Sequence, residues 1–234
     1  MHRDHPGYGY RLITHHLRQN GAVVSKDRVH KLCKKHHIWA HFVKKNPRYP
    51  RSLPPSCENL VKRVFTAEAP NQKWVIDITE HPTKEGTLYL CAIKDLYSNK
   101  IVGYSMSPNR CADIATSALE MAIRDRKPPA GLIIHSDRGS QFRAKTYLKI
   151  INQHSLRQSM GNKGSSADNA AIESFFSLLQ KNVLNLQKWE TRQELREAIF
   201  TWIHKEYNNK RPQQKLGRQT PNQYEKINQA ATAA

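Results

Sequence analysis

The sequence predicts an α/β fold, with a mixed sheet flanked by helices and a small helical segment at the N-terminus. Three runs rich in apolar and β-favouring residues follow one another at 74–79 (WVIDIT), 88–93 (LYLCAI) and 100–106 (KIVGYSM). Such runs are typical of neighbouring strands. Helical periodicity and short apolar runs then alternate along the chain. This order favours a mixed sheet with helices on its faces.

The segments after the third run each show one periodicity. A helix is predicted over 112–126, where four apolar residues share one face: Ile114, Ala118, Met121 and Ala122. Short strands are predicted at 132–134, continuing into His135, and at 156–159, with a helix at 142–154 between them. The next helix begins near Ala170, and its apolar stripe contains Ile172, Phe176, Leu179, Val183 and Leu186.

Residues 1–43 are predicted to form a basic, helix-turn-helix-like segment. Ile13 and Leu17 mark one face of a first helix that ends at Gly21, and Ser25 suits the N-cap of a second helix. The second helix is expected to place three residues on its inner face: Val29, Leu32 and His36. Two helices joined by a Gly-containing turn are typical of DNA readers, but also of helical pairs that never touch DNA. The candidate DNA contacts are Lys26, Arg28 and Lys31.

Composition divides the rest of the chain into three parts. Residues 44–69 are expected to form a basic linker, because KKNPRYPRSLPPS at their start carries four prolines and four basic residues. Residues 70–190 contain the predicted strands and the helices between them. Residues 191–234 are predicted to be a helical tail, with a helix near 192–207.

The charge of the chain indicates a polyanionic partner. Lys and Arg number 38 against 19 Asp and Glu, a formal net charge of +19. Residues 1–63 contribute +11 and residues 64–234 contribute +8, so the excess is concentrated near the N-terminus. Such an excess indicates nucleic acid or an anionic membrane. No apolar run approaches the roughly 18–20 residues needed to span a membrane, which favours DNA.

Targeting signals and cysteine usage favour the cytoplasm. The N-terminus, MHRDHPGYGY, carries no apolar signal segment. The four cysteines form no C-x-x-C motif, and scattered thiols fit a reducing compartment. No G-x-x-x-x-G-K-[ST] string occurs, so no nucleotide-fuelled step is expected.

Three carboxylates stand in three different settings that suit one metal site. Asp77 lies in an apolar strand, Asp137 follows the strand at 132–134, and Glu173 borders the apolar stripe of the helix near 170. Oxygen ligands from such elements suit hard divalent cations, and strand exits are where open α/β sheets place their chemistry. Two of the three also have an ordinary reading: Asp77 as an outward-facing strand residue and Asp137 as a turn residue.

Two neighbouring side chains are given other expected roles. Asp168 precedes Glu173 by five residues, about 140° around a helix of 3.6 residues per turn, so it suits the N-cap rather than the same site. His135 is two residues before Asp137, and the expected role is a packed strand-end histidine.

The motifs around these carboxylates carry a family resemblance. WVIDIT from Trp74, HSDRGSQF from His135 and DNAAIESFF from Asp168 resemble the DDE integrase core of bacterial insertion-sequence transposases, and most of all the catalytic subunit of the IS-three group. YNNKRP and LGRQTP resemble the C-terminal signature of that group, and GYGYRLITHHL resembles its helix-turn-helix-like segment. The resemblance covers nearly the whole chain.

This resemblance implies a fold, a chemistry and a set of partners. The fold would be ribonuclease-H-like, and Asp77, Asp137 and Glu173 would hold two Mg²⁺ or Mn²⁺ ions for DNA strand cleavage and strand transfer. The residues assigned to DNA near the metals are Arg138, Lys163, Gln180 and Lys181. At Gln180 the family usually has Lys or Arg, so this chain lacks that charge. The implied partners are element and target DNA, further copies of the chain, and an upstream-frame DNA-binding subunit.

Two other functions remain open from the sequence. A DNA-binding regulator of transposition, or a decayed transposase, would explain Gln180 and the abbreviated N-terminus, although the intact carboxylates argue against decay. A ribonuclease or repair nuclease is possible because one fold supports many functions, but the basic N-terminal segment and the C-terminal signature disfavour it.

Overall fold

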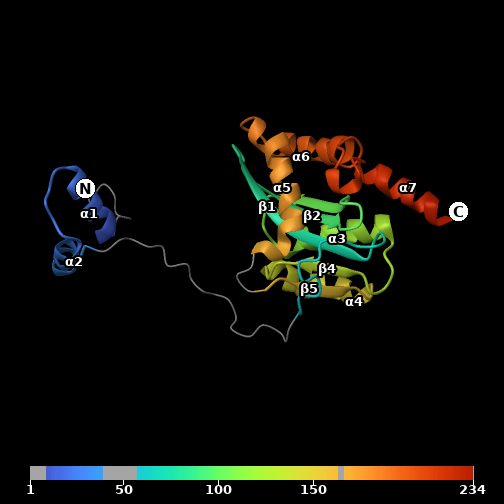
Figure 1. Ribbon diagram of the computed structural model, residues 1–234, viewed down its shortest axis with the longest axis horizontal. Helices are drawn as coiled ribbons and strands as arrows, with labels where there is room; N and C mark the ends of the chain where they lie inside the picture. Colours follow the sequence, from blue (N-terminus) through green and yellow to red (C-terminus); the bar gives the residue numbers. More distant parts are fainter. Residues whose placement is uncertain (1–8, 39–56, 163–165, 234) are drawn as a thin grey trace. The chain divides into compact units, whose positions relative to one another are not determined.

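The computed structural model describes residues 9–38, 57–162 and 166–233, which fall into two units, one within residues 1–54 and the other within residues 55–234 (Figure 1). The predicted linker lies mostly outside the described residues, so the domain boundaries stay predictions. None of the described helices is both long enough and apolar enough to cross a membrane.

The N-terminal unit is a pair of helices, α1 (Tyr10–Gln19) and α2 (Lys26–Lys35). Ser25 caps α2 as predicted, because its Oγ accepts a hydrogen bond from the Arg28 N–H at 3.2 Å. The small core between the helices contains Ile13, Val29 and Cys33. The predictions for Leu32 and His36 were wrong: Leu32 is 47% exposed, His36 is also exposed, and Cys33 packs inward instead.

The C-terminal unit, as we call residues 55–234, is built on a five-stranded mixed sheet in the order β3-β2-β1-β4-β5. The strands are β1 (Lys73–Thr83), β2 (Gly86–Asp95), β3 (Ile101–Ser107), β4 (Ile133–Ser136) and β5 (Arg157–Met160). β2 is antiparallel to both β1 and β3, whereas β4 is parallel to both β1 and β5. Strands β1, β3, β4 and β5 therefore all end at the same edge of the sheet.

Helices cover both faces of this sheet, as Figure 1 shows. The alternation of side chains along β1 sends Trp74 and Ile76 into one core, with α3 (Ala112–Arg126) and α4 (Lys145–Gln153). Val75 points into the other core, with α5 (Ala170–Asn182) and α6 (Arg192–Thr201). The mixed α/β fold predicted from the sequence is confirmed.

The end of α5 differs from the predicted stripe. The helix ends at Asn182, and Val183, with φ −137° and ψ −65°, leaves the helical conformation. Leu186 is consequently 70% exposed instead of continuing the buried face. The chain turns there toward α6, which continues as a π-helical segment over Trp202–Tyr207.

The C-terminal helix α7 (Pro221–Ala233) is held by ion pairs to the end of α3 and to the turn between β2 and β3. Glu225 is 5% exposed and accepts hydrogen bonds at 2.8 Å from both Nη atoms of Arg126. Lys100 Nζ lies 3.2 Å from the same carboxylate. The chain beyond residue 191 therefore packs with the sheet in one unit.

Candidate active site

Asp77 lies in the middle of β1 and faces the layer of α5 and α6. Its strand neighbour Val75 and its cross-strand partner Ala92 both belong to the core on that side. The side chain is half-buried, and its Oδ1 accepts a hydrogen bond from the Ile78 N–H at 2.8 Å. The side chain of Asp77 therefore does not point outward from a solvent-exposed face of the sheet.

Asp137 follows β4 directly and lies beside Asp77. The last parallel pair between β1 and β4 joins Val75 to His135, so continuing this register by two residues brings Asp137 level with Asp77. Asp137 Oδ1 accepts a hydrogen bond from the Gly139 N–H at 2.8 Å. A Cβ at Gly139 would lie 2.9 Å from that oxygen, so glycine leaves room for the carboxylate at the exit of β4.

Glu173 is in the first turn of α5 and is exposed. The buried residues Ile172 and Phe175 on either side of it hold α5 against the sheet. Glu173 therefore borders the buried face, as the sequence predicts.

The three carboxylates lie within electrostatic reach of one another. Burial raises the pKa of Asp77 from 3.8 to about 7, the Ile78 N–H opposes this rise, and the charges of Asp137 and Glu173 add to it. The guanidinium of Arg110 lowers the pKa of Asp77. Like charges this close to Asp77 disfavour its ionisation, and a bound cation would offset that repulsion.

The donor set fits a hard divalent cation in its chemistry. All three groups are carboxylates, the ligand type that Mg²⁺ and Mn²⁺ prefer. Asp77 and Asp137 each direct one oxygen at a backbone N–H, and within the described part of the chain Oδ2 of each makes no hydrogen bond. Among the same residues, however, no three His, Cys, Asp or Glu side chains are gathered closely enough to hold an ion as they stand.

The prediction that Asp168 caps α5 was wrong. The N-cap is Asn169, which makes no side-chain capping bond. The Asp168 carboxylate instead accepts hydrogen bonds from Asn59, Arg63 and Asn162. Asn169 is 6% exposed, and neither polar atom of its amide has a partner among the described residues. A buried amide without hydrogen-bond partners destabilises the folded state. Asn169 lies one helical turn before Glu173.

The other predicted DNA contacts have different settings. Gln180 and Lys181 are exposed on α5, and Lys26, Arg28 and Lys31 are exposed on α2 in the N-terminal unit. Arg138 donates from Nε to the Gly161 carbonyl at 2.8 Å, which joins the loops after β4 and β5. Lys163 lies outside the described residues. All of these assignments remain predictions.

Two basic residues were missed from the sequence: one contacts the start of α5, and the other acts electrostatically on Asp77. Lys94 is 5% exposed, and its Nζ donates to the Ala171 carbonyl at 3.0 Å and lies 3.5 Å from Ser174 Oγ. Burial, with the charge of Lys215, lowers its pKa to about 8. The period-two pattern of LYLCAIK does place Lys94 on the face of Leu90 and Ala92, and this was the available signal. Arg110 offers no such signal, because it lies in a loop.

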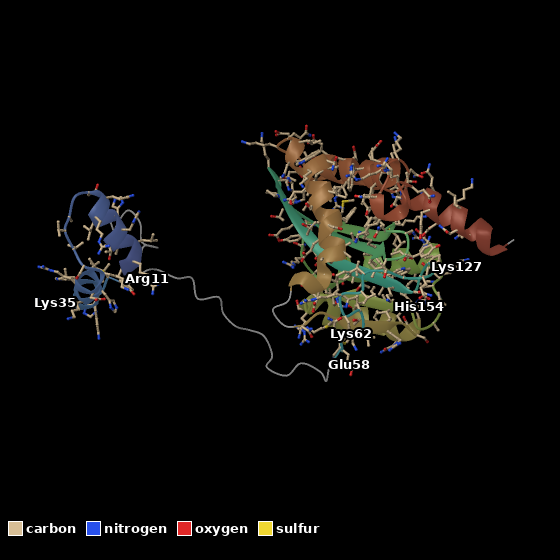
Figure 2. The ribbon with its side chains drawn as sticks, viewed as in Figure 1. Arg11, Lys35, Glu58, Lys62, Lys127 and His154 are labelled. Carbon is tan, nitrogen blue, oxygen red and sulfur yellow. The ribbon has the colours of Figure 1, made fainter. Side chains whose placement is uncertain are left out.

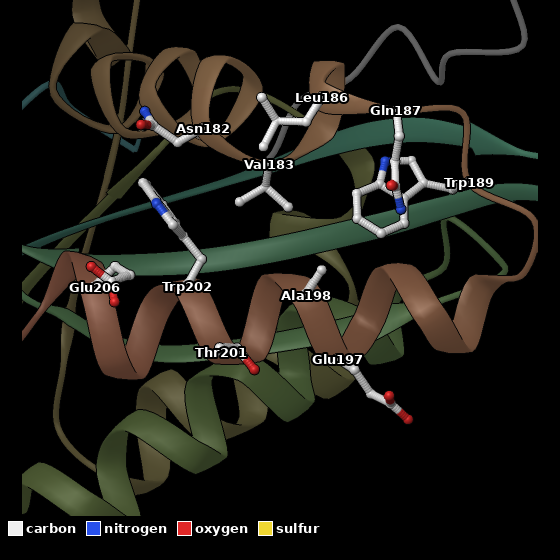
Figure 3. A pocket seen from close by; sticks show the side chains of 10 residues that line it. All are labelled: Asn182, Val183, Leu186, Gln187, Trp189, Glu197, Ala198, Thr201, Trp202 and Glu206. Carbon is white, nitrogen blue, oxygen red and sulfur yellow. The ribbon is translucent and has the colours of Figure 1, made fainter.

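A separate hollow lies at the far end of α5 (Figure 3). Apolar and polar side chains both line it: Asn182, Val183, Leu186, Gln187, Trp189, Glu197, Ala198, Thr201, Trp202 and Glu206. Asn182 is nine residues beyond Glu173, roughly 14 Å at 1.5 Å per helical residue. This hollow is therefore distinct from the carboxylate site.

Three family models match the chain. Two models, each described as an integrase core domain, match residues 67–166 and 154–221. A model described as an HTH-like domain matches residues 1–46.

Solved structures of integrases share the fold of the C-terminal unit. The magnesium-bound catalytic core domain of HTLV-2 integrase matches 68% of this chain and 99% of its own, with a TM-score of 0.51 and 19% identity. A chain of the simian T-cell lymphotropic virus intasome, in complex with PP2A subunit B56 gamma, matches 93% of this chain and 70% of its own, with a TM-score of 0.54 and 16% identity.

Bacterial relatives are much closer in sequence. A 31 kDa protein of insertion element IS600 from Shigella sonnei is 38% identical over 98% of this chain and 85% of its own length. The transposase of IS904 from Lactococcus lactis is 38% identical over 96% and 90%. The InsF transposase of IS3A from Escherichia coli is 41% identical over 75% and 61%. The chain belongs to the IS3 family of insertion-sequence transposases.

Proposed function

We propose that this chain cuts DNA at the ends of an insertion sequence and joins the freed ends to target DNA, with Asp77, Asp137 and Glu173 as its catalytic carboxylates. The observation that carries the proposal is their electrostatic convergence from β1, the exit of β4 and the first turn of α5. Family membership supports the reaction class, and the all-carboxylate donor set supports a divalent cation.

The three carboxylates would hold one or two Mg²⁺ or Mn²⁺ ions. Such ions, when bound, lower the pKa of a nucleophilic oxygen and stabilise the leaving oxygen in phosphoryl transfer. Asp77 contributes a half-buried charge fixed in the sheet, and Asp137 is held in place by the Gly139 N–H. Lys94 helps to fix Glu173, because its ammonium binds α5 on both sides of that residue, at Ala171 and Ser174.

Arg110 is proposed to contact the phosphate of the bound DNA. It is exposed between β3 and α3, at the edge where β1 and β4 also leave the sheet, and its charge reaches Asp77. A guanidinium there adds positive charge beside a site that must accept a phosphodiester, and it presents several N–H donors to one phosphate.

The partners are proposed on similar grounds. The HTH-like match and the basic N-terminal residues support binding to the element ends. The fold likeness to an intasome chain supports action as an oligomer on DNA. We also propose a cytoplasmic place of action and, by family, an upstream-frame DNA-binding subunit as a partner.

Replacement of Glu173 by Gln tests the proposed chemistry. The amide keeps the size of the side chain but removes the charge that attracts the cation, so we expect cleavage of element-end DNA in Mg²⁺ to be lost while DNA affinity stays within about twofold. Cleavage and binding would be measured on the same labelled duplex, with Glu120→Gln on α3 as a matched control. Unchanged cleavage by the Glu173→Gln protein would refute the role of Glu173.

A non-catalytic DNA-binding regulator is the second candidate. It is favoured by the finding that no three ligating side chains among the described residues are grouped for an ion. The same assay separates the two functions: a regulator binds the duplex but leaves it uncut at any Mg²⁺ or Mn²⁺ concentration. A covalent protein–DNA adduct would indicate a different recombination mechanism.

A further inference from the structure

The residues just before the first strand run along β5. We call residues 57–65 the entry segment. The Met160 N–H donates to the Glu58 carbonyl at 3.3 Å, and the Leu60 N–H donates to Ser159 Oγ at 2.9 Å. Val61 is 1% exposed, so the segment is packed into the C-terminal unit. Figure 2 labels Glu58 and Lys62, which show where it lies.

The carboxylate of Asp168 joins this segment to the start of α5. Asp168 is 1% exposed. Its Oδ1 accepts from Arg63 Nε at 2.8 Å, and its Oδ2 accepts from Asn59 Nδ2 at 3.1 Å. The same Oδ2 accepts from the Asn162 N–H, in the loop after β5, at 2.8 Å. The buried carboxylate of Asp168 thus binds the start of α5 to the entry segment, whose Asn59 and Arg63 lie more than 100 residues earlier in the sequence.

The backbone of Asp168 is fixed as well, through β4. His135 is fully buried, with Nε2 2.8 Å from the Asp168 carbonyl and Nδ1 2.8 Å from Ser159 Oγ. A carbonyl only accepts, so Nε2 carries the proton. Nδ1 of the same ring is hydrogen-bonded to the Ser159 hydroxyl. That hydroxyl in turn accepts from Leu60, which closes a chain of bonds back to the entry segment.

These bonds end next to two of the three catalytic carboxylates. His135 is two residues before Asp137, and Asp168 is five residues before Glu173. A side chain at the start of a helix is placed by the first turn, and the first turn of α5 has no side-chain cap of its own. The position of Glu173 relative to Asp137 therefore depends on Asp168 and on the groups that bind it.

We propose that Asp168 is a positioning residue that braces the first turn of α5 against the entry segment, so that Glu173 is held in register with Asp137. Arg63 and Asn59 supply the hydrogen bonds from the entry segment to the Asp168 carboxylate, and these contacts form the brace. The inference rests on the proposed function of Glu173, but the brace itself is a property of the fold and is measurable without DNA.

Arg63→Ala is the main test, because the Arg63 side chain is 62% exposed and its loss leaves no buried cavity. The matched control is Arg124→Ala, since Arg124 makes the same Nε-to-Oδ1 contact, also at 2.8 Å, with Asp125 on the surface of α3. Hydrogen exchange of the amides of residues 168–174 in the metal-free full chain should be several-fold faster in the Arg63→Ala protein than in the wild type. The Arg124→Ala protein should exchange like the wild type.

Cleavage kinetics supply the second measurement. For Arg63→Ala we expect kcat to fall by roughly 10- to 100-fold, the range for a reacting group displaced by about 1 Å. KM for the DNA should stay within about twofold, because no phosphate contact is removed. Arg63→Lys should restore part of kcat, whereas a purely structural loss would lower the thermal midpoint of the whole unit in step with activity.

Two outcomes would overturn the proposal. Exchange and kcat equal to wild type in the Arg63→Ala/Asn59→Ala double variant would show that α5 needs no brace. An equal change in the Arg63→Ala and Arg124→Ala proteins would show that the effect is not specific to Asp168. If the wild-type chain does not cut DNA, the proposed function fails, but the exchange contrast between these variants still decides whether the brace exists.

Discussion

At Asp77, both burial and the neighbouring negative charges disfavour the ionised form of the carboxyl group. The side chain is half-buried beneath α5, and two further carboxylates disfavour its ionisation. A cation at the site would relieve both effects at once, because it replaces lost hydration and neutralises the repulsion. The raised pKa of Asp77 is therefore expected of the metal-free state.

The raised pKa of Asp77 predicts that the stability of the folded protein depends on pH. The folded pKa of Asp77 is about 7, above its ordinary value of 3.8, so the folded state binds more protons than the unfolded state between those values. The stabilisation by the protonated group is complete below the ordinary pKa and is lost as the pH rises through 7. The metal-free wild type should thus lose stability relative to Asp77→Asn between about pH 5 and about pH 8.

Urea unfolding of both proteins in a chelating buffer would measure this difference. The other titratable groups are common to both proteins, so their contributions to the stability difference cancel. A stability difference that stays constant between the two pH values would contradict the raised pKa of Asp77.

The second prediction at this scale concerns Arg110. Its charge lowers the pKa of Asp77, so Arg110→Ala should move the pH midpoint of the Asp77 effect upward. If Arg110 also contacts one phosphate, the slope of log affinity against log salt should become less steep by about 0.9 on duplex DNA. Arg124→Ala is the matched control, because Arg124 is exposed and its charge does not contribute to the pKa shift of Asp77. If neither the pH midpoint nor the salt slope changes, Arg110 does not belong to the site.

At the scale of elements, the sheet places the site through close contact with helices on both faces. Lys94 ties β2 to α5 on one face. On the other face, β3 approaches α3 so closely that Gly103 has no room for a side chain: a Cβ there would lie 2.5 Å from the Ala118 carbonyl oxygen and 2.7 Å from Ala122 Cβ. Since α3 begins just after Arg110, this contact also sets where that loop lies.

Gly103→Ala should therefore destabilise the C-terminal unit. The clash is with helix backbone, which cannot move aside as a flexible side chain does, so we expect a loss of about 1–3 kcal/mol in the free energy of unfolding, the usual range for overpacking. Chemical denaturation followed by tryptophan fluorescence would measure it. Wild-type stability in this variant would show that β3 and α3 are further apart than the structure has them.

At the scale of the whole molecule, the charge is divided between the two units. Residues 1–54 carry 12 Lys and Arg against 2 Asp and Glu, and residues 55–234 carry 26 against 17. The N-terminal residues are therefore much more basic per residue. The packing of the entry segment also shows where a truncation belongs: removal of residues 1–63 would take away Arg63 and Asn59, whereas removal of residues 1–54 leaves the brace intact.

Deletion of residues 1–54 should reduce the salt dependence of DNA binding. Each phosphate neutralised contributes about −0.9 to the slope of log affinity against log salt, so loss of the N-terminal contacts should make the slope less steep by several units. Titration of element-end and random duplexes at several salt concentrations would measure this. An unchanged slope would mean that residues 1–54 do not contact DNA.

Sequence specificity needs a separate comparison. Phosphate contacts position a protein without reading bases. Replacement of Lys26, Arg28 and Lys31 by Ala should weaken binding to element ends more than to random DNA if α2 reads the sequence. Equal weakening on both duplexes would leave α2 as an electrostatic contact only.

The sequence by itself determined the elements and the positions of the carboxylates along them. Periodicity placed the strands and α3 and α5 because those patterns are local, and Ser25 was recognisable as a cap because its partner is three residues away. Asp77 and Asp137 could be assigned to strand and strand exit for the same reason. These features depend on residues close together in the chain, which a sequence displays directly.

Only the tertiary structure decided which distant groups meet. Asp168 looked like a helix cap, but its partners Asn59 and Arg63 lie more than 100 residues before it. Lys94 gained its role from the carbonyl of Ala171, and the exposure of Leu186 followed from a backbone turn at Val183. A buried charge is stable only with partners around it, and those partners are chosen by the packing of the sheet and helices, which no local pattern records.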